Sequence, residues 1–194
     1  MTNFALLQTN IAFDDPKANY ENVRKLFASA MAKTPRPDVV VLPEDWSAGF
    51  SDKMFHEMEK HCETPDGPTL KVCKDLAKEY HVWVVAGSIS TLHADGKMRN
   101  TVFLIDRDGN VVGDYSKMHL YSDMDEDAQL THGDKHEVYD TEFGRVGMMV
   151  CYDIRFCELS RIYALKKADV LVVVSNFPNP RVNHWRTLLM ARAI

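Results

Sequence analysis

The chain has 194 residues, of which 45% are hydrophobic and 26% charged, so we expect a soluble globular protein with a single domain over residues 1–194 rather than a disordered chain. Its formal net charge of −5 and the lack of a Lys/Arg cluster argue against a nucleic-acid partner. No apolar run reaches the ~18 residues of a membrane span, and the first residues do not resemble a signal peptide, so we expect no membrane partner and a cytoplasmic location.

The first part of the chain is predicted to form two strands separated by a helix. Residues 4–7 are a short apolar strand candidate. Asp15 fits an N-cap and Pro16 the first helical position, and apolar residues at helical spacing continue that helix to about residue 33. Residues 38–42 read D-V-V-V-L, a β-branched run typical of a strand that is covered on both faces.

The middle of the chain predicts one helix followed by three strands. The helix carries an apolar stripe over residues 70–80, on which we expect Cys73 to pack in the core. The strands are predicted over residues 82–89, 99–105 and 111–115. The last two are joined by D-R-D-G-N, which is a strong hairpin signal.

The last part predicts a long acidic loop, two strands and two helices. The loop is expected over residues 123–134. Apolar residues 146–150 and 169–174 predict buried strands, and helical patterns follow them at about 155–166 and from about 182. Because helices and strands alternate while hairpins interrupt that alternation, the pattern predicts an α/β layered fold with a mixed sheet.

Cys151 lies where the predicted strand over residues 146–150 gives way to a helix. A thiol in that tight turn is close to the free N–H groups and the positive dipole end of the helix, which favour an anion. We therefore expect the turn to lower the thiol pKa and to stabilise an oxyanion. Four cysteines with no Cys-x-x-Cys pair are too few for a disulfide scaffold, so we expect reduced thiols.

Glu44, Lys117 and Cys151 share one structural context, because each follows an apolar strand. In open α/β sheets, ligands bind in the crevice beyond the carboxyl ends of the strands, so these three side chains are expected to meet in one pocket. There Lys117 supplies positive charge for a thiolate and an oxyanion. Glu44 accepts the thiol proton and later activates water. Such a set suits the hydrolysis of an amide.

The stretches around these residues resemble the nitrilase, or carbon–nitrogen hydrolase, superfamily, whose catalytic set is Glu, Lys and Cys in that chain order. They read V-V-L-P-E-D-W around Glu44, D-Y-S-K-M-H-L around Lys117 and G-M-M-V-C-Y-D-I-R-F-C-E-L around Cys151. Agreement extends to S-N-F-P-N-P and to the closing H-W-R-T-L-L-M-A-R-A-I. We expect Asn176 and Phe177 of the first of these segments to bind substrate.

By that resemblance, Cys151 attacks an amide carbonyl and forms a thioester with loss of ammonia, and water then releases the carboxylic acid. Lys117 and the backbone N–H of Tyr152 are implied to bind the oxyanion. The family also carries a second glutamate after the lysine, which orients lysine and substrate. Glu126 best fits that place among the acidic residues 125–127.

The resemblance further implies an α-β-β-α sandwich that pairs through its helical faces into a homodimer, with no metal or organic cofactor. Family chains usually continue past A-R-A-I into strands that complete the second sheet. We therefore expect either that the C-terminal part is missing here or that the missing edge is covered in some other way. An uncovered sheet edge and apolar face would favour aggregation or tight self-association. Cys157 stands where relatives commonly have proline, and it is expected to be a packing change rather than a second, redox-sensitive thiol.

Three other kinds of site are less well supported. His119, His132 and His136 match no standard zinc spacing and are interpreted as solvated loop histidines. His184 follows Cys151 as a protease base would, but the local signatures of Cys–His proteases are absent. Residues 85–88, V-A-G-S, lack the glycine spacing of a phosphate loop.

The substrate class follows from the resemblance alone. C-Y-D-I-R-F with E-L, G-F-S at 49–51 and K-M-H-L look most like the branches that include ω-amidases, which act on terminal amides of small dicarboxylic or 2-oxo acids. An N-carbamoyl compound hydrolase is the alternative, a nitrilase is third, and a catalytically impaired member with a binding or assembly role is a further alternative. The acidic loop around Glu126 disfavours an anionic substrate unless an arginine offsets it, and the sequence assigns no arginine to that role.

Overall fold

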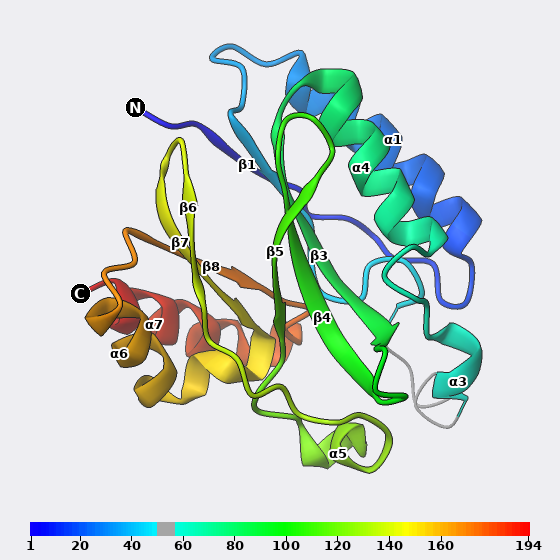
Figure 1. The fold of residues 1–194 in the computed structure, drawn as a ribbon, viewed down its shortest axis with the longest axis vertical. Coiled ribbons are helices and arrows are strands. Elements are labelled where there is room, and N and C mark those ends of the chain that lie inside the picture. The colour runs from blue at the N-terminus through cyan, green and yellow to red at the C-terminus, as the bar shows by residue number, and fades with distance from the viewer. Residues whose placement is uncertain (50–56) are drawn as a thin grey trace.

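The computed structural model describes residues 1–49 and 57–194 and has four layers (Figure 1). A five-stranded sheet and a three-stranded sheet form the central layers. Helices α1 (Pro16–Met31) and α4 (Pro68–Tyr80) cover the first sheet, and α6 (Cys157–Leu165) and α7 (Val182–Ala193) cover the second. The predicted α-β-β-α class with mixed sheets is confirmed. The G-F-S stretch lies mostly outside the described residues.

The first sheet has the strand order β1-β2-β3-β4-β5 and is mixed. Strands β1 (Phe4–Leu6), β2 (Val39–Val41) and β3 (Trp83–Leu92) run parallel. Strands β4 (Met98–Ile105) and β5 (Val111–Ser116) add to β3 in antiparallel fashion. The predicted D-R-D-G-N hairpin joins β4 to β5, which pair antiparallel as this signal predicts.

The second sheet consists of β6 (Val138–Thr141), β7 (Gly144–Val150) and β8 (Val170–Val174). The central strand β7 pairs antiparallel with β6 and parallel with β8. Helix α6 connects β7 to β8, as a parallel crossover requires. Cys151 follows directly on β7, so the turn that carries it leaves the sheet at its carboxyl edge.

Alternate residues of β2 belong to different hydrophobic cores. Val40 packs in the core between the first sheet and helices α1 and α4, whereas Val39 and Val41 pack in the core between the two sheets. This burial on both faces explains the continuous β-branched run in the sequence. Cys73 is fully buried in the first of these cores, as the stripe on α4 predicted.

Two segments differ from the sequence prediction. The expected loop at 123–134 contains a 3-10 helix at Ser122–Met124 and a one-turn helix α5 (Glu126–Gln129), which are too short to produce a recognisable hydrophobic period. The helix expected from about residue 155 begins two residues later, after a 3-10 helix at Cys151–Arg155. The remaining short elements within residues 1–49 and 57–194 are α3 (Met58–His61) and a 3-10 helix at Asn179–Arg181.

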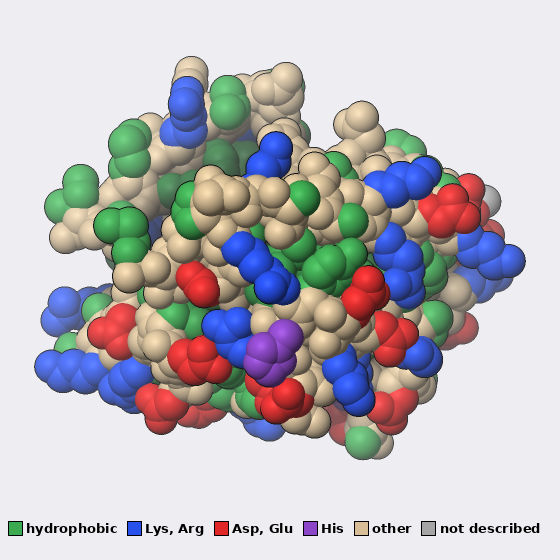
Figure 2. Space-filling model, turned by 90° about the horizontal axis from the view of Figure 1, so that it is seen from above, with side chains coloured by type: hydrophobic (Ala, Val, Ile, Leu, Met, Phe, Trp, Pro, Cys, Tyr) green, Lys and Arg blue, Asp and Glu red, His purple; other side chains and the backbone are tan. Residues whose placement is uncertain are grey.

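The surface carries charges of both signs. On the face shown in Figure 2, Lys and Arg side chains are interspersed with Asp and Glu side chains. This face therefore offers no extended basic surface of the kind that binds nucleic acid. Within residues 1–49 and 57–194, no helix combines the length and the apolar character needed to cross a membrane.

Candidate active site

The ends of three strands bring Glu44, Lys117 and Cys151 to one cavity of about 250 Å³. Glu44 follows β2, Lys117 follows β5 and Cys151 follows β7. The cavity is also lined by three residues that the sequence predicted to bind substrate: Tyr152, Asn176 and Phe177. The seventh predicted residue, Glu126, lies behind the cavity against Lys117.

The loop that carries Glu44 lies unusually close to β3. Gly87 on β3 has φ of +68°, and a Cβ at this position would lie 2.1 Å from the carbonyl oxygen of Pro43. Glycine is therefore needed for the backbone of β3 to pass beside the Pro43–Glu44 segment. Trp46 Nε1 donates to the Ala86 carbonyl oxygen at 2.8 Å and fixes the other side of the loop. The V-A-G-S stretch thus positions Glu44 rather than a phosphate.

Lys117 is a fully buried cation between two carboxylates. Its Nζ lies 3.0 Å from Glu44 Oε1 and 2.8 Å from Glu126 Oε2, and none of the three side chains is more than 1% exposed. Burial alone would lower the pKa of the Lys117 ammonium, but the Glu44 and Glu126 carboxylates outweigh burial and raise it. Lys117 therefore stays protonated, which suits a hydrogen-bond donor to an oxyanion and excludes a general base.

Among the three consecutive acidic residues after Lys117, the structure places only Glu126 in contact with it. Glu126 is fully buried and also accepts a hydrogen bond from the backbone N–H of Tyr121 at 2.8 Å. Burial raises the pKa of Glu126, and the Lys117 ammonium counteracts this rise. Asp125 and Asp127 are exposed. The geometry therefore assigns the lysine-orienting position to Glu126.

The Glu44 carboxylate is held on both of its oxygens. Oε1 accepts from Lys117 Nζ and, at 3.2 Å, from Asn100 Nδ2, while Oε2 accepts from the backbone N–H of Asn176 at 2.9 Å. Asn176 therefore orients Glu44 through its backbone as well as lining the cavity. A carboxylate fixed in this way can face the Cys151 thiol without rotating away.

The Cys151 thiol is not activated in the way that the sequence suggested. Burial raises its pKa well above the usual range and the nearby Glu44 carboxylate raises it further, whereas Lys117 and Ser175 lower it. The expected lowering is wrong because Cys151 begins a short 3-10 turn rather than an α-helix, and loss of hydration dominates. With φ of +45°, Cys151 sits in a strained turn as a protonated thiol beside a carboxylate base.

Asp153 holds this turn in place. The buried carboxylate accepts hydrogen bonds from the Val150 N–H at 2.9 Å, from Tyr115 Oη at 2.8 Å and from the backbone N–H of His119 at 3.0 Å. His119 Nδ1 lies 2.8 Å from the same carboxylate. These contacts join the nucleophile turn to β5 and to the segment after Lys117, so Asp153 and His119 position the site.

Other reactive side chains lie elsewhere. Cys157 is exposed at the start of α6, so the expectation that it packs is wrong. His184 is exposed on α7. Among the described residues, no group of three or more His, Cys, Asp or Glu side chains could hold a metal ion.

Two arginines that the sequence did not assign line the cavity: Arg155 and Arg181. The Arg155 guanidinium lies 5.6 Å from the ring centroids of both Tyr152 and Phe177, and in the described part of the chain it has no carboxylate partner. Arg181 donates to Tyr121 Oη at 2.5 Å. The 3-10 turn at Cys151–Arg155 brings Arg155 back toward the cavity. The α-helix expected from about residue 155 does not predict this direction of the Arg155 side chain.

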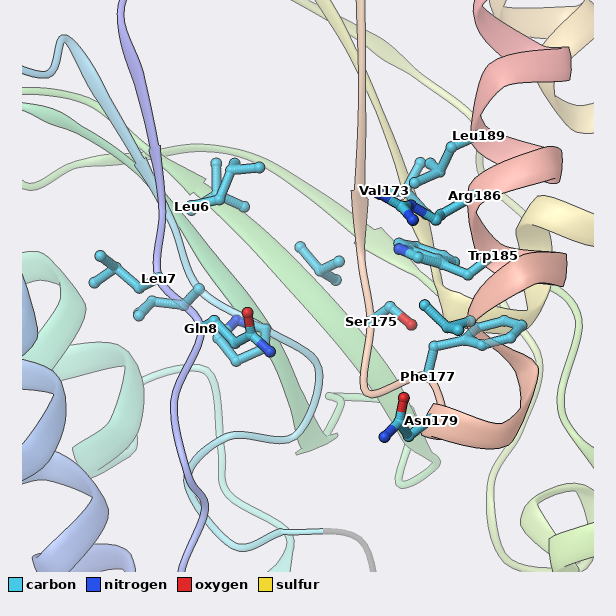
Figure 3. A pocket seen from close by; sticks show the side chains of 15 residues that line it. Leu6, Leu7, Gln8, Val173, Ser175, Phe177, Asn179, Trp185, Arg186 and Leu189 are labelled. Carbon is cyan, nitrogen blue, oxygen red and sulfur yellow. The ribbon is translucent and has the colours of Figure 1, made fainter.

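A larger cleft of about 820 Å³ borders the cavity (Figure 3). One wall comes from β1 and the residues after it, including Leu6 and Gln8, and the opposite wall includes Trp185 and Leu189 of α7. Phe177 lines both spaces, but none of the three reactive side chains lines the cleft. The chemistry therefore belongs to the smaller cavity.

Comparisons with known proteins agree with this geometry. The family model described as carbon–nitrogen hydrolase matches residues 3–194. A Staphylococcus lugdunensis protein named hydrolase in agr operon is 40% identical over 81% of this chain and 66% of its own length. The 2-oxoglutaramate amidase of Bacillus subtilis is 33% identical over 97% of this chain and 70% of its own length.

The crystal structure of Saccharomyces cerevisiae Nit3, described as a member of branch 10 of the nitrilase superfamily, superposes with a TM-score of 0.89. It is 29% identical in sequence, and the match covers 100% of this chain and 71% of that chain. The chain thus spans between 66% and 71% of the length of these three proteins.

Proposed function

Because this chain belongs to the carbon–nitrogen hydrolase family, we propose that it hydrolyses the terminal amide of a small carboxylic acid through a thioester on Cys151. The match over residues 3–194 confirms the family that the motifs indicated, and the predicted class of enzyme, a carbon–nitrogen hydrolase, agrees with it. The observation that carries the proposal is the convergence of Glu44, Lys117 and Cys151 in one cavity.

In the first half of the reaction, the Cys151 proton passes to Glu44 and the sulfur attacks the amide carbonyl carbon. The carbonyl oxygen becomes an oxyanion next to the Lys117 ammonium and the backbone N–H of Tyr152. Glu44 then returns the proton to the amide nitrogen, the C–N bond breaks and ammonia leaves. The raised thiol pKa fits this order, because the proton leaves sulfur only when the attack begins.

In the second half, Glu44 takes a proton from water, and the resulting hydroxide attacks the thioester carbon. The C–S bond breaks, the proton returns to the Cys151 sulfur and the carboxylic acid is released. Glu126 takes no proton in these steps. Its contacts of 2.8 and 3.0 Å with Lys117 Nζ keep the ammonium aimed at the oxyanion.

Arg155 favours an anionic substrate. Its guanidinium lies against the rings of Tyr152 and Phe177 at the cavity, where it can pair with the carboxylate at the far end of a terminal amide. A cavity of about 250 Å³ suits a short dicarboxylic monoamide. The B. subtilis relative is named for an amide of this kind, which supports an ω-amidase-like activity for this chain.

Ammonia release from a matched panel tests this proposal. We expect succinamate, the monoamide of a four-carbon diacid, to be hydrolysed with a kcat/KM at least about tenfold above that of butanamide, since an Arg–carboxylate pair contributes about 1.5–3 kcal/mol. Replacing Arg155 with Gln should remove most of this preference and raise KM for succinamate. Arg161→Gln, an exposed change on α6 outside the cavity, should leave both substrates unaffected.

The same panel decides between the alternatives. Selective hydrolysis of an N-carbamoyl amino acid would favour the N-carbamoyl hydrolase, and selective hydrolysis of butyronitrile would favour a nitrilase. A folded chain that hydrolyses none of these compounds would support the binding or assembly role. The single domain over 1–194, the cytoplasmic location, the homodimer and the lack of a cofactor remain proposals, which the sequence and the family resemblance support.

A further inference from the structure

Asp45, directly after Glu44, is a buried carboxyl group that the proposed reaction does not use. It is 3% exposed, and its backbone has φ of +44°. Asp45 Oδ1 lies 3.4 Å from Ser90 Oγ, and Asp45 Oδ2 lies 3.4 Å from Asn100 Nδ2. A buried carboxyl that is not part of the chemistry needs a partner or a proton.

Three carboxyl groups converge on the Asn100 amide nitrogen. Nδ2 lies 3.2 Å from Glu44 Oε1, 3.3 Å from Glu126 Oε1 and 3.4 Å from Asp45 Oδ2. An amide nitrogen carries two hydrogens, so it can donate to two of the three groups at once. The nitrogen rather than the oxygen must face them, because ionised carboxylates only accept hydrogen bonds. The amide can therefore satisfy only two of the three groups at once, and Asp45, at 3.4 Å, is the most distant of them.

Charge balance identifies which group holds the proton. Lys117 Nζ makes ion pairs with Glu44 and Glu126, and in the described part of the chain no ion pair joins it to Asp45. Three ionised carboxylates around one ammonium would leave two uncompensated buried charges. A proton on Asp45 removes one of them, while the Ser90 hydroxyl donates to Asp45 Oδ1.

We propose that Asp45 is held as the neutral acid and acts as a positioning residue, which keeps the two Asn100 protons directed at the Glu44 and Glu126 carboxylates. Ionised Asp45 would compete for these protons. Both Glu44, the base, and Glu126, which orients Lys117, would then lose part of their hydrogen bonding to Asn100. The positioning role depends on the proposed amidase function, whereas the protonation state of Asp45 does not.

The groups that face Asp45 support this assignment. Among the described residues, the titratable ones are Glu44 beside it, Glu126 on α5, Lys117 after β5 and Cys62 after α3. Burial raises the pKa of Asp45 well above its usual range and the Glu44 and Glu126 carboxylates raise it further, whereas Lys117 and the hydrogen bond from Ser90 lower it by less. Lys117 is the only cation in this set, and its two ion pairs are already made.

Asp45→Asn is the sharpest test, because an amide mimics the neutral acid and asparagine tolerates a positive φ. Infrared spectra of the wild-type protein at neutral pH should contain the C=O stretch of an un-ionised carboxylic acid, and Asp45→Asn should lose it. Asp14→Asn, at an exposed residue with φ of +58°, should retain it. A band that survives in Asp45→Asn and disappears in Glu126→Gln would place the proton on Glu126 and overturn the proposal.

Thermal unfolding gives a second readout that needs no activity. A carboxyl with a raised folded-state pKa takes up a proton on folding, so its contribution to stability is lost as pH rises above the unfolded value of about 3.9. The Tm of Asp45→Asn relative to wild type should therefore increase steadily between about pH 4 and pH 7. A constant difference in Tm across this range would show that Asp45 is ionised in the folded protein.

Activity separates positioning from simple packing. Asp45→Asn should keep kcat within about threefold of wild type, whereas Asp45→Ala should lower kcat about 10–100-fold with little change in KM. Equal losses in both variants would mean that the carboxylate charge is needed, against the proposal. If the wild-type chain hydrolyses no amide, the proposed function fails, while the infrared band and the Tm shift still decide the state of Asp45.

Discussion

The Cys151→Ala variant should release no measurable ammonia from any amide that the wild-type chain hydrolyses, which means a loss of at least about a thousandfold in kcat. The physical reason is that Cys151 carries the only thiol lining the cavity of Glu44 and Lys117 in the described part of the chain. Without its sulfur no thioester can form. The measurement is ammonia release at saturating succinamate, with circular dichroism to show that the fold is retained.

Cys157→Ala is the matched control for this variant. Cys157 is exposed, lies six residues after the nucleophile and is absent from the cavity lining. Its removal should leave kcat and KM unchanged. Loss of activity in Cys157→Ala with retention in Cys151→Ala would show that Cys157, not Cys151, is the nucleophile. Equal loss in both variants would point to a pair of cooperating thiols.

Lys117→Met should lose both activity and about 3–5 kcal/mol of unfolding free energy. Methionine fills a similar volume but leaves the Glu44 and Glu126 carboxylates buried without their cation. The loss should shrink at low pH, because removal of the cation raises the already raised pKa of Glu126 further, so this carboxyl takes up a proton more readily in the folded variant. Urea unfolding followed by tryptophan fluorescence at about pH 4 and pH 7 measures both effects.

An exposed lysine provides the comparison. Lys71 Nζ pairs with Asp75 at 2.7 Å on the surface of α4, where its side chain is 70% exposed. Lys71→Met should cost no more than about 1 kcal/mol and should leave activity intact. If the unfolding free energy of Lys117→Met equals that of Lys71→Met at neutral pH, the buried ion pairs of Lys117 with Glu44 and Glu126 do not stabilise the folded protein.

The sequence predicted the frame of the site because that frame depends on local patterns. The two-sided burial of β2 follows from three consecutive valines at 39–41, and the position of Glu44 follows from the strand that precedes it. The strand before Cys151 is equally clear in its apolar run, and the strand before Lys117 follows from the hairpin signal that precedes it. Three apolar strands that each end in a reactive residue were sufficient to predict one shared pocket.

The electrostatics of the site could not be read from the same patterns. Asn100 contacts Glu44 across 56 positions of sequence and Asp45 across 55, and no local rule places a strand asparagine among three carboxyl groups. The thiol pKa was misjudged for a related reason, since burial and a neighbouring carboxylate outweigh a turn that resembles a helix start. Arg155 was missed because a 3-10 turn, not an α-helix, sets its direction.

Intact-protein mass spectrometry after rapid acid quenching tests the proposed chemistry most directly. During turnover of succinamate, a fraction of the protein should gain the mass of the amide minus ammonia, and peptide analysis should place this acyl group on Cys151. The adduct should be absent from Cys151→Ala. Release of ammonia without any adduct, or an acyl group on another residue, would contradict a thioester formed by Cys151 beside Glu44 and Lys117.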